Sequence, residues 1–194
     1  MAFFEEFSYM PNTKVRVIDN SKIELTCVNE VSGVTPRMLL WNFLNRTNER
    51  YLMWHPKHIG FEVLSQPLDC GVGSIYLIKQ QWEGGPVMDT VAEVLEADLD
   101  ETKAVFRERI RQAELPLVIY HRFEVMPGGT RIFSNFTFGS DDKEQNAQLA
   151  ERLKIRTEEG YKVAFTHIQE ECKNFEKIVP KLFEAHADDR WKGK

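Results

Sequence analysis

The C-terminal part of the chain has the clearest helical pattern. Over residues 158–185, apolar side chains recur at the spacing of one buried helical face, because residues three or four apart lie on the same side of a helix. The residues of this stripe are Ala164, Ile168, Phe175 and Ile178. We therefore predict one long amphipathic helix over 158–185, which Pro180 could kink near its end.

The middle of the chain alternates apolar and polar residues at the period of a β-strand. Two short strands are expected first, over 14–18 and 22–28, joined by the turn residues between them. Further β-type runs follow from about residue 60 to residue 139, separated by turns that contain glycine. These runs are 59–64, 73–82, 87–97, 102–110, 115–125 and 130–139. Their succession predicts an antiparallel meander of five or six strands.

A second helical region is expected over 35–54. Thr35 is a typical N-cap residue, and Pro36 follows at the first helical position, where its missing N–H is not needed. Pro56 marks the end of this region.

Together these elements predict the α+β class, in which an antiparallel sheet carries its helices on one face. A curved sheet that grips a long terminal helix, a helix-grip arrangement, encloses a cavity between the two. We expect one domain over 1–194, with a short lead-in at 1–13 and a mobile tail at 186–194.

Charge and composition exclude some classes of partner. The chain has 25 Lys and Arg against 30 Asp and Glu, a net charge of -5, and its basic residues are interspersed with acids. Proteins that bind nucleic acid usually carry a basic patch, so we do not expect this protein to bind nucleic acid. No segment approaches the ~20 apolar residues of a membrane helix, and no signal peptide is recognisable. Three widely spaced cysteines fit a reducing cytosol, so a cytoplasmic protein is expected.

His167 and Glu171 form the first candidate site. They stand four residues apart in the amphipathic segment, so they share one helical face, and that face is the apolar one. Buried charges need partners. A metal ion would satisfy both side chains, but a hydrogen bond between His167 and Glu171 would explain the pair as well.

His121 is the second candidate. The run 117–125 alternates, which places His121 on the apolar face of a strand. If the C-terminal helix covers this sheet, His121 faces His167 across one cavity and could serve as a general acid or base. The alternative is a core histidine bonded to a backbone carbonyl.

The segment WHPKH supplies two further histidines, His55 and His58. Their spacing would let both reach one ion, or let one bind metal while the other contacts a substrate. They could also be cationic side chains at a helix C-terminus. Trp41 and Tyr51 could wall an aromatic pocket, although packing in the core explains them equally well.

Four segments resemble one enzyme family in their order and approximate spacing. They are WHPKH, WEGG, YHRFE with PGGTRIFS, and HIQEE. The family is the metal-dependent C–C hydrolases of acylated phloroglucinols, which includes 2,4-diacetylphloroglucinol hydrolase and phloretin hydrolase. The resemblance covers most of residues 35–180. It implies a Bet v 1-like helix-grip fold, a zinc ion held by two His and two Glu, and cleavage of the bond between a phenolic ring carbon and an acyl carbonyl.

Carried over residue by residue, the resemblance implies that His55, Glu83, His167 and Glu171 bind the metal. It gives His121 the proton-transfer role. His58 falls where the family has an asparagine that contacts the phenol, so it is expected to bind substrate together with Trp41 and Tyr51. Gln81 and Glu93 are rivals of Glu83, and Phe136 stands where a tyrosine is expected.

The implied cofactor is Zn²⁺, with Fe²⁺ or Mn²⁺ as other metals that suit imidazole and carboxylate ligands. The implied partner is a small aromatic or polyketide-like substrate, and a homodimer is left open. Two other readings remain: a helix-grip protein that binds an apolar small molecule without chemistry, and a cyclase or another aromatic-metabolite enzyme on the same scaffold.

Overall fold

The computed structural model describes residues 4–18, 22–81, 87–111, 116–139 and 158–186. Within these ranges one antiparallel sheet contains nine strands in the order β1-β2-β3-β9-β8-β7-β6-β5-β4. The strands are β1 (Phe4–Phe7), β2 (Thr13–Ile18), β3 (Lys22–Ser32), β4 (His58–Ser65), β5 (Ile75–Gln81), β6 (Val87–Leu99), β7 (Lys103–Ile110), β8 (Leu117–Met126) and β9 (Gly129–Phe138). The helices are α1 (Pro36–Leu44), α2 (Asn48–Leu52) and α4 (Glu158–Ala185).

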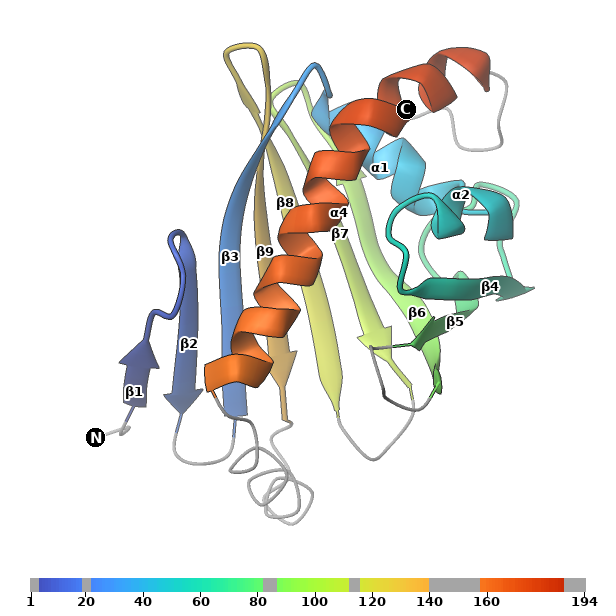
Figure 1. The fold of residues 1–194 in the computed structure, drawn as a ribbon. Coiled ribbons are helices and arrows are strands. Elements are labelled where there is room, and N and C mark those ends of the chain that lie inside the picture. Colours follow the sequence, from blue (N-terminus) through green and yellow to red (C-terminus); the bar gives the residue numbers. More distant parts are fainter. Residues whose placement is uncertain (1–3, 19–21, 82–86, 112–115, 140–157, 187–194) are drawn as a thin grey trace.

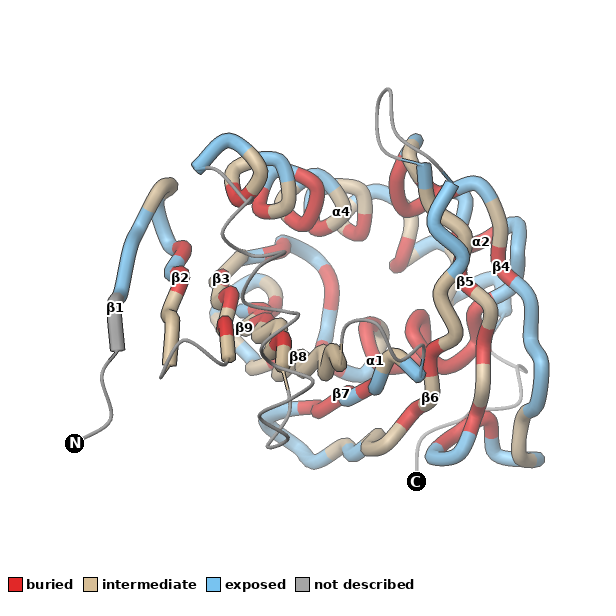
Figure 2. The backbone as a smooth tube through the Cα atoms, turned by 90° about the horizontal axis from the view of Figure 1, so that it is seen from below, coloured by how far each residue is buried: buried red, intermediate tan, exposed pale blue. Residues whose placement is uncertain are grey.

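The sheet curves into a trough, and α4 lies across its open side (Figures 1 and 2). The short helices α1 and α2 lie near the C-terminal end of α4 and strands β4–β6 (Figure 1). Six strands, β4 to β9, form the predicted meander. The α+β, helix-grip fold is therefore confirmed.

The long amphipathic helix is also present as predicted. Its buried residues recur on the side that faces the sheet: Tyr161, Phe165, His167, Ile168, Cys172, Phe175 and Val179. The helix continues through Pro180 to Ala185. None of the helices in the described ranges is long and apolar enough to span a membrane.

The second helical region differs from the prediction, because 35–54 forms two helices rather than one. Thr35 caps α1 by accepting a hydrogen bond from the Met38 N–H. The chain then leaves the helical path, and Thr47 caps α2 by accepting from the Arg50 N–H. Since a second capping residue starts a new helix, the break at residues 45–47 is built into the sequence.

Within the expected lead-in at 1–13, residues Phe4–Phe7 form β1, which pairs with β2. The Phe7 ring stacks on Tyr9, and Tyr9 stacks on Tyr161 of α4. These aromatic contacts tie the start of the chain to the helix. Of the expected tail, residues 187–194 lie outside the described ranges, and His186 is exposed.

A cavity of about 800 Å³ lies between α4 and the sheet. Most of its lining is apolar and comes from inward-facing strand residues and the buried side of the helix. Examples are Leu25, Ile119, Phe123, Phe136, Ile168 and Phe175. A volume of this size accommodates a small organic ligand.

Candidate metal centre

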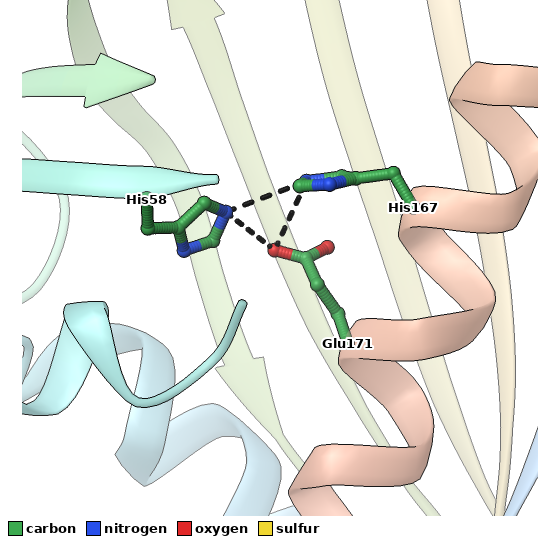
Figure 3. Close-up of side chains that lie close together, drawn as sticks. All are labelled: His58, His167 and Glu171. Carbon is green, nitrogen blue, oxygen red and sulfur yellow. Dashed lines mark hydrogen bonds and ion pairs between the residues drawn. The ribbon is translucent and has the colours of Figure 1, made fainter. Parts of the chain in front are cut away.

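Three side chains converge on one point of the cavity wall. His167 and Glu171 lie one turn apart on α4, and His58 is the first residue of β4 (Figure 3). The His58 Nε2 atom is 3.0 Å from Glu171 Oε1 and 3.4 Å from His167 Nε2. The third side of the triangle, from His167 Nε2 to Glu171 Oε1, is 3.6 Å.

The backbone of α2 fixes the orientation of His58. Its Nδ1 is 3.0 Å from the Tyr51 carbonyl oxygen, and its ring lies flat on the Tyr51 ring with 4.0 Å between centroids. A carbonyl only accepts hydrogen bonds, so Nδ1 carries the proton and a neutral ring presents its Nε2 lone pair to the cluster. Metal-binding histidines are commonly held in this way, by a hydrogen bond from the other ring nitrogen.

The triangle fits a metal ion. Tetrahedral zinc, with bonds of about 2.0–2.1 Å, separates its ligand atoms by about 3.3–3.4 Å, which lies within the three observed separations. The Nε2 lone pair of a neutral His58 faces a carboxylate oxygen at 3.0 Å. Only a positive charge between these two atoms, a proton or a metal ion, makes that contact favourable. Two imidazoles and one carboxylate are also a usual ligand set for zinc or iron.

Burial affects the pKa values of two groups of the cluster, Glu171 and His167. Burial alone would raise the pKa of the Glu171 carboxyl, but the contact with His58 and the nearby His167 hold that pKa below its usual range. Burial lowers the pKa of His167 to about 4. At neutral pH the cluster therefore offers an ionised carboxylate and a neutral His167, which are the forms that bind metal.

The structure places His55 differently from the prediction. Its Nε2 is 2.8 Å from Glu170 Oε2, and its Nδ1 accepts a hydrogen bond from the Lys57 N–H. Both ring nitrogens are thus engaged outside the triangle, although the His55 ring lies only 4.1 Å from the His167 ring, between centroids. Of these two histidines, His58, which was expected to contact substrate, is the one whose ring nitrogen lies in the triangle.

His121 lies on β8 and lines the cavity, on the face that strand alternation predicted. Its Nδ1 is 2.9 Å from the Ser134 hydroxyl oxygen. Aromatic rings surround it, with Phe43 and Phe123 at centroid distances of 5.1 and 6.0 Å. Burial in this apolar cage lowers the pKa of His121 to about 4, so the ring is neutral at pH 7.

The fourth predicted ligand, Glu83, lies outside the described residues. Of its two rivals, Glu93 accepts hydrogen bonds from Arg109 and does not line the cavity. Gln81 is exposed at the end of β5. Its neighbour Gln80 points inward instead, and its amide nitrogen lies 3.4 Å from His58 Nε2.

Of the two aromatic residues expected to contact substrate, only one lines the cavity. Tyr51 lines the cavity, and its hydroxyl accepts a hydrogen bond from Gln80. Trp41 does not line it, contrary to expectation. It is buried against Phe183 and the Arg50 guanidinium, where it packs α1 against the end of α4.

Several polar residues of the cavity wall were missed, among them Arg46, Gln80, Glu108 and Ser134. A signal existed for three of these four. Gln80 follows Ile78 with period two, Glu108 follows Phe106 and Ser134 follows Ile132 in the same way, so alternation alone turns all three inward. Arg46 lies between two helices, where no periodicity predicts its direction.

Comparison with known proteins shows the fold but no family. No protein-family model matches the sequence, and no curated protein matches it. Among solved structures, a major latex-like protein from Panax ginseng aligns with a TM-score of 0.60 at 11% identity, over 82% of this chain and 98% of that one. A START superfamily protein from Mycobacterium smegmatis gives 0.58 at 12% identity, over 82% and 98%.

A protein of a biosynthetic pathway is also among the similar structures. The di-domain ARO/CYC StfQ from the steffimycin biosynthetic pathway aligns with a TM-score of 0.57 at 10% identity, over 84% of this chain and 52% of that one. Sequence identities this low support a statement about the fold alone. This chain has the Bet v 1/START-like helix-grip architecture.

Proposed function

We propose that this protein is a metal-dependent hydrolase that cleaves the carbon–carbon bond between a phenolic ring and an acyl carbonyl. One observation carries the proposal: His58, His167 and Glu171 bring three ligand atoms within 3.0–3.6 Å of one another. They do so on the wall of a cavity of about 800 Å³, large enough for an aromatic ketone.

Two further observations support the proposal. The sequence resembles the acylphloroglucinol hydrolases in the segments that contain His58, His121, His167 and Glu171. StfQ, whose helix-grip fold is similar, is named for a biosynthetic pathway, so this architecture is compatible with chemistry on small organic molecules.

The reaction requires water and one proton transfer. The hydroxyl of water adds to the acyl carbonyl carbon, the ring–acyl bond breaks, and its electron pair takes a proton at the ring carbon. The products are a carboxylic acid and the phenolic ring without its acyl group. A bound zinc ion would polarise the carbonyl and make water a better nucleophile.

The residues of this chain supply the remaining parts. His121 is neutral at pH 7 because its pKa lies near 4, and its Nδ1 is held by Ser134. This leaves Nε2 as the ring nitrogen that can take a proton from the attacking water and then give it to the ring carbon. The apolar lining excludes bulk water from the reacting bond.

The test begins with metal analysis of protein purified without added metal. We expect about one zinc, iron or manganese ion per chain, and hydrolysis of an acylphloroglucinol that a chelator abolishes and added metal restores. His167→Ala should lose the metal while it keeps a folded circular dichroism spectrum. His121→Ala should keep the metal and lose roughly 10²–10⁴-fold in kcat, the usual contribution of a positioned acid or base.

Two outcomes would contradict the proposal. Wild-type protein that is purified without bound metal, and that binds aromatic ketones without converting them even after metal is added, would be a binding protein. Full metal retention in His167→Ala would remove the cluster from the mechanism.

A further inference from the structure

A buried ion pair lies on the cavity wall in addition to the three-residue cluster. Arg46, between α1 and α2, and Glu108, on β7, are only 4% and 5% exposed. The Arg46 Nη2 atom donates a hydrogen bond to Glu108 Oε2 over 3.0 Å, and both residues line the cavity. Neither residue has a role in the reaction described above.

The surroundings of this pair are unusual for charged groups. The Arg46 guanidinium lies 4.7–5.9 Å from the centroids of five aromatic rings, those of Phe43, Trp54, Phe61, Tyr76 and Phe106. Removing two charges from water costs several kcal/mol, and hydrophobic residues of similar volume often give an equally stable or more stable protein. Stability alone therefore does not explain why two charged side chains occupy this part of the wall.

The pair also has hydrogen-bonding capacity left over. The Nε atom of Arg46 donates a hydrogen bond to the Phe43 carbonyl oxygen, and its Nη2 atom donates one to Glu108. Among the described residues, neither the second terminal nitrogen of Arg46 nor Oε1 of Glu108 makes a hydrogen bond. A donor on Arg46 and an acceptor on Glu108 thus remain available on the cavity wall.

The Phe43 ring lies near both Arg46 of the ion pair and His121. The guanidinium carbon of Arg46 is 5.9 Å from the Phe43 centroid, and the His121 ring is 5.1 Å from the same centroid. Arg46 and His121 thus both lie near the Phe43 ring, on the wall of the same cavity.

We infer that Arg46 and Glu108 form a subsite for a phenolic hydroxyl of the ligand, in which Arg46 donates a hydrogen bond to the hydroxyl oxygen and Glu108 accepts one from the hydroxyl. A hydroxyl is the group that needs one donor and one acceptor at the same place. The pair is neutral overall, so it offers a ligand carboxylate no net attraction. The inference rests on the proposed function only in taking the ligand to be an aromatic ketone.

The experiment measures binding to metal-free protein, so that it does not depend on turnover. Two probes, 2,4,6-trihydroxyacetophenone and acetophenone, differ only in their ring hydroxyls. We expect wild type to bind the hydroxylated probe roughly 10- to 100-fold more tightly, as a hydrogen bond to a charged group contributes. The double variant Arg46→Met/Glu108→Leu replaces both charges together, and it should lose most of this preference while its affinity for acetophenone stays within about threefold.

A matched control uses an ion pair on the outer surface of the same strand. Arg107 and Glu96 pair across β7 and β6, are partly exposed and do not line the cavity. Arg107→Met/Glu96→Leu should keep the wild-type preference. Should the buried double variant fail to fold, Glu108→Gln provides the readout, because it keeps the shape of the side chain and removes its charge. It should lower the preference for the hydroxylated probe at least threefold.

Two results would overturn the inference. A preference unchanged in the folded variants would show that other groups recognise the hydroxyls. An equal loss of affinity for both probes would show that the pair only supports the shape of the cavity. Loss of the hydroxyl preference in a protein that never hydrolyses a ketone would support the subsite while contradicting the hydrolase.

Discussion

One backbone carbonyl, that of Tyr51, determines which nitrogen of His58 faces the cluster with His167 and Glu171. Because the carbonyl only accepts, it holds the proton on Nδ1 and turns the Nε2 lone pair toward His167 and Glu171. His55 lacks such an arrangement, since its Nε2 already contacts Glu170. Two histidines three residues apart thus differ in their suitability as ligands.

This difference gives a prediction that separates the structure from the sequence resemblance. His58→Ala should lower zinc affinity by more than about 100-fold, because losing a ligand costs more than the 10- to 100-fold typical of an outer partner. His55→Ala should lower it about 10-fold or less. Competition titration with a chromogenic chelator measures both values. The reverse order would restore His55 as the ligand.

The pH dependence of stability tests the burial of His121. Its pKa is about 4 in the folded protein against 6.5 for the free side chain, because burial disfavours the charged ring. Between these two values the unfolded chain binds more protons, so the free energy of unfolding must fall as the pH is lowered from about 6.5 to 4. His121→Phe removes this group, and its stability should decline less steeply over the same range.

Urea unfolding of metal-free protein at several pH values between about 7 and 4.5 measures this slope. His186→Gln is the control, since His186 is exposed beyond α4. An unchanged slope in His121→Phe would mean that His121 protonates freely in the folded protein.

At the scale of elements, the cluster depends on how α4 docks against the segment between α2 and β4. The Asn174 amide donates to the Trp54 carbonyl oxygen over 2.9 Å, directly before His55 and His58 in sequence. We predict that Asn174→Leu weakens zinc binding roughly threefold to tenfold, equivalent to one lost hydrogen bond, although every ligand remains. Lys173→Ala, exposed on the same helix, should have no effect. Equal affinities in all three proteins would show that the segment is held by other contacts.

Periodicity explains which elements the sequence could predict. The stripe on 158–185 predicted α4, and alternation placed His121 on the inner face of β8. The same rule applied to β5 and β7 would have found Gln80 and Glu108. It could not choose between His55 and His58, because the turn around Pro56 has no period. The direction of each ring depends there on contacts with α2, which is close in sequence, and with α4, which is more than 100 residues away.

At the scale of the whole molecule, the trough and α4 together create the cavity, and filling it tests whether ligands bind there. Ile119 lies two residues before His121 and lines the cavity, so Ile119→Trp places a large ring inside it. Because the added volume enters existing space, we expect the free energy of unfolding to change by less than about 2 kcal/mol. Acetophenone affinity should fall at least 10-fold.

Val118→Trp is the matched control, because Val118 is the adjacent residue of β8 and does not line the cavity. Ligand binding to the native state raises the free energy of unfolding by about 2.7 kcal/mol at a ligand concentration of 100 Kd. Wild type and Val118→Trp should therefore both gain stability from the ligand, and Ile119→Trp should not. Equal gains in all three would place the ligand outside this cavity, and would remove the reason to connect His121 and the metal centre through one bound molecule.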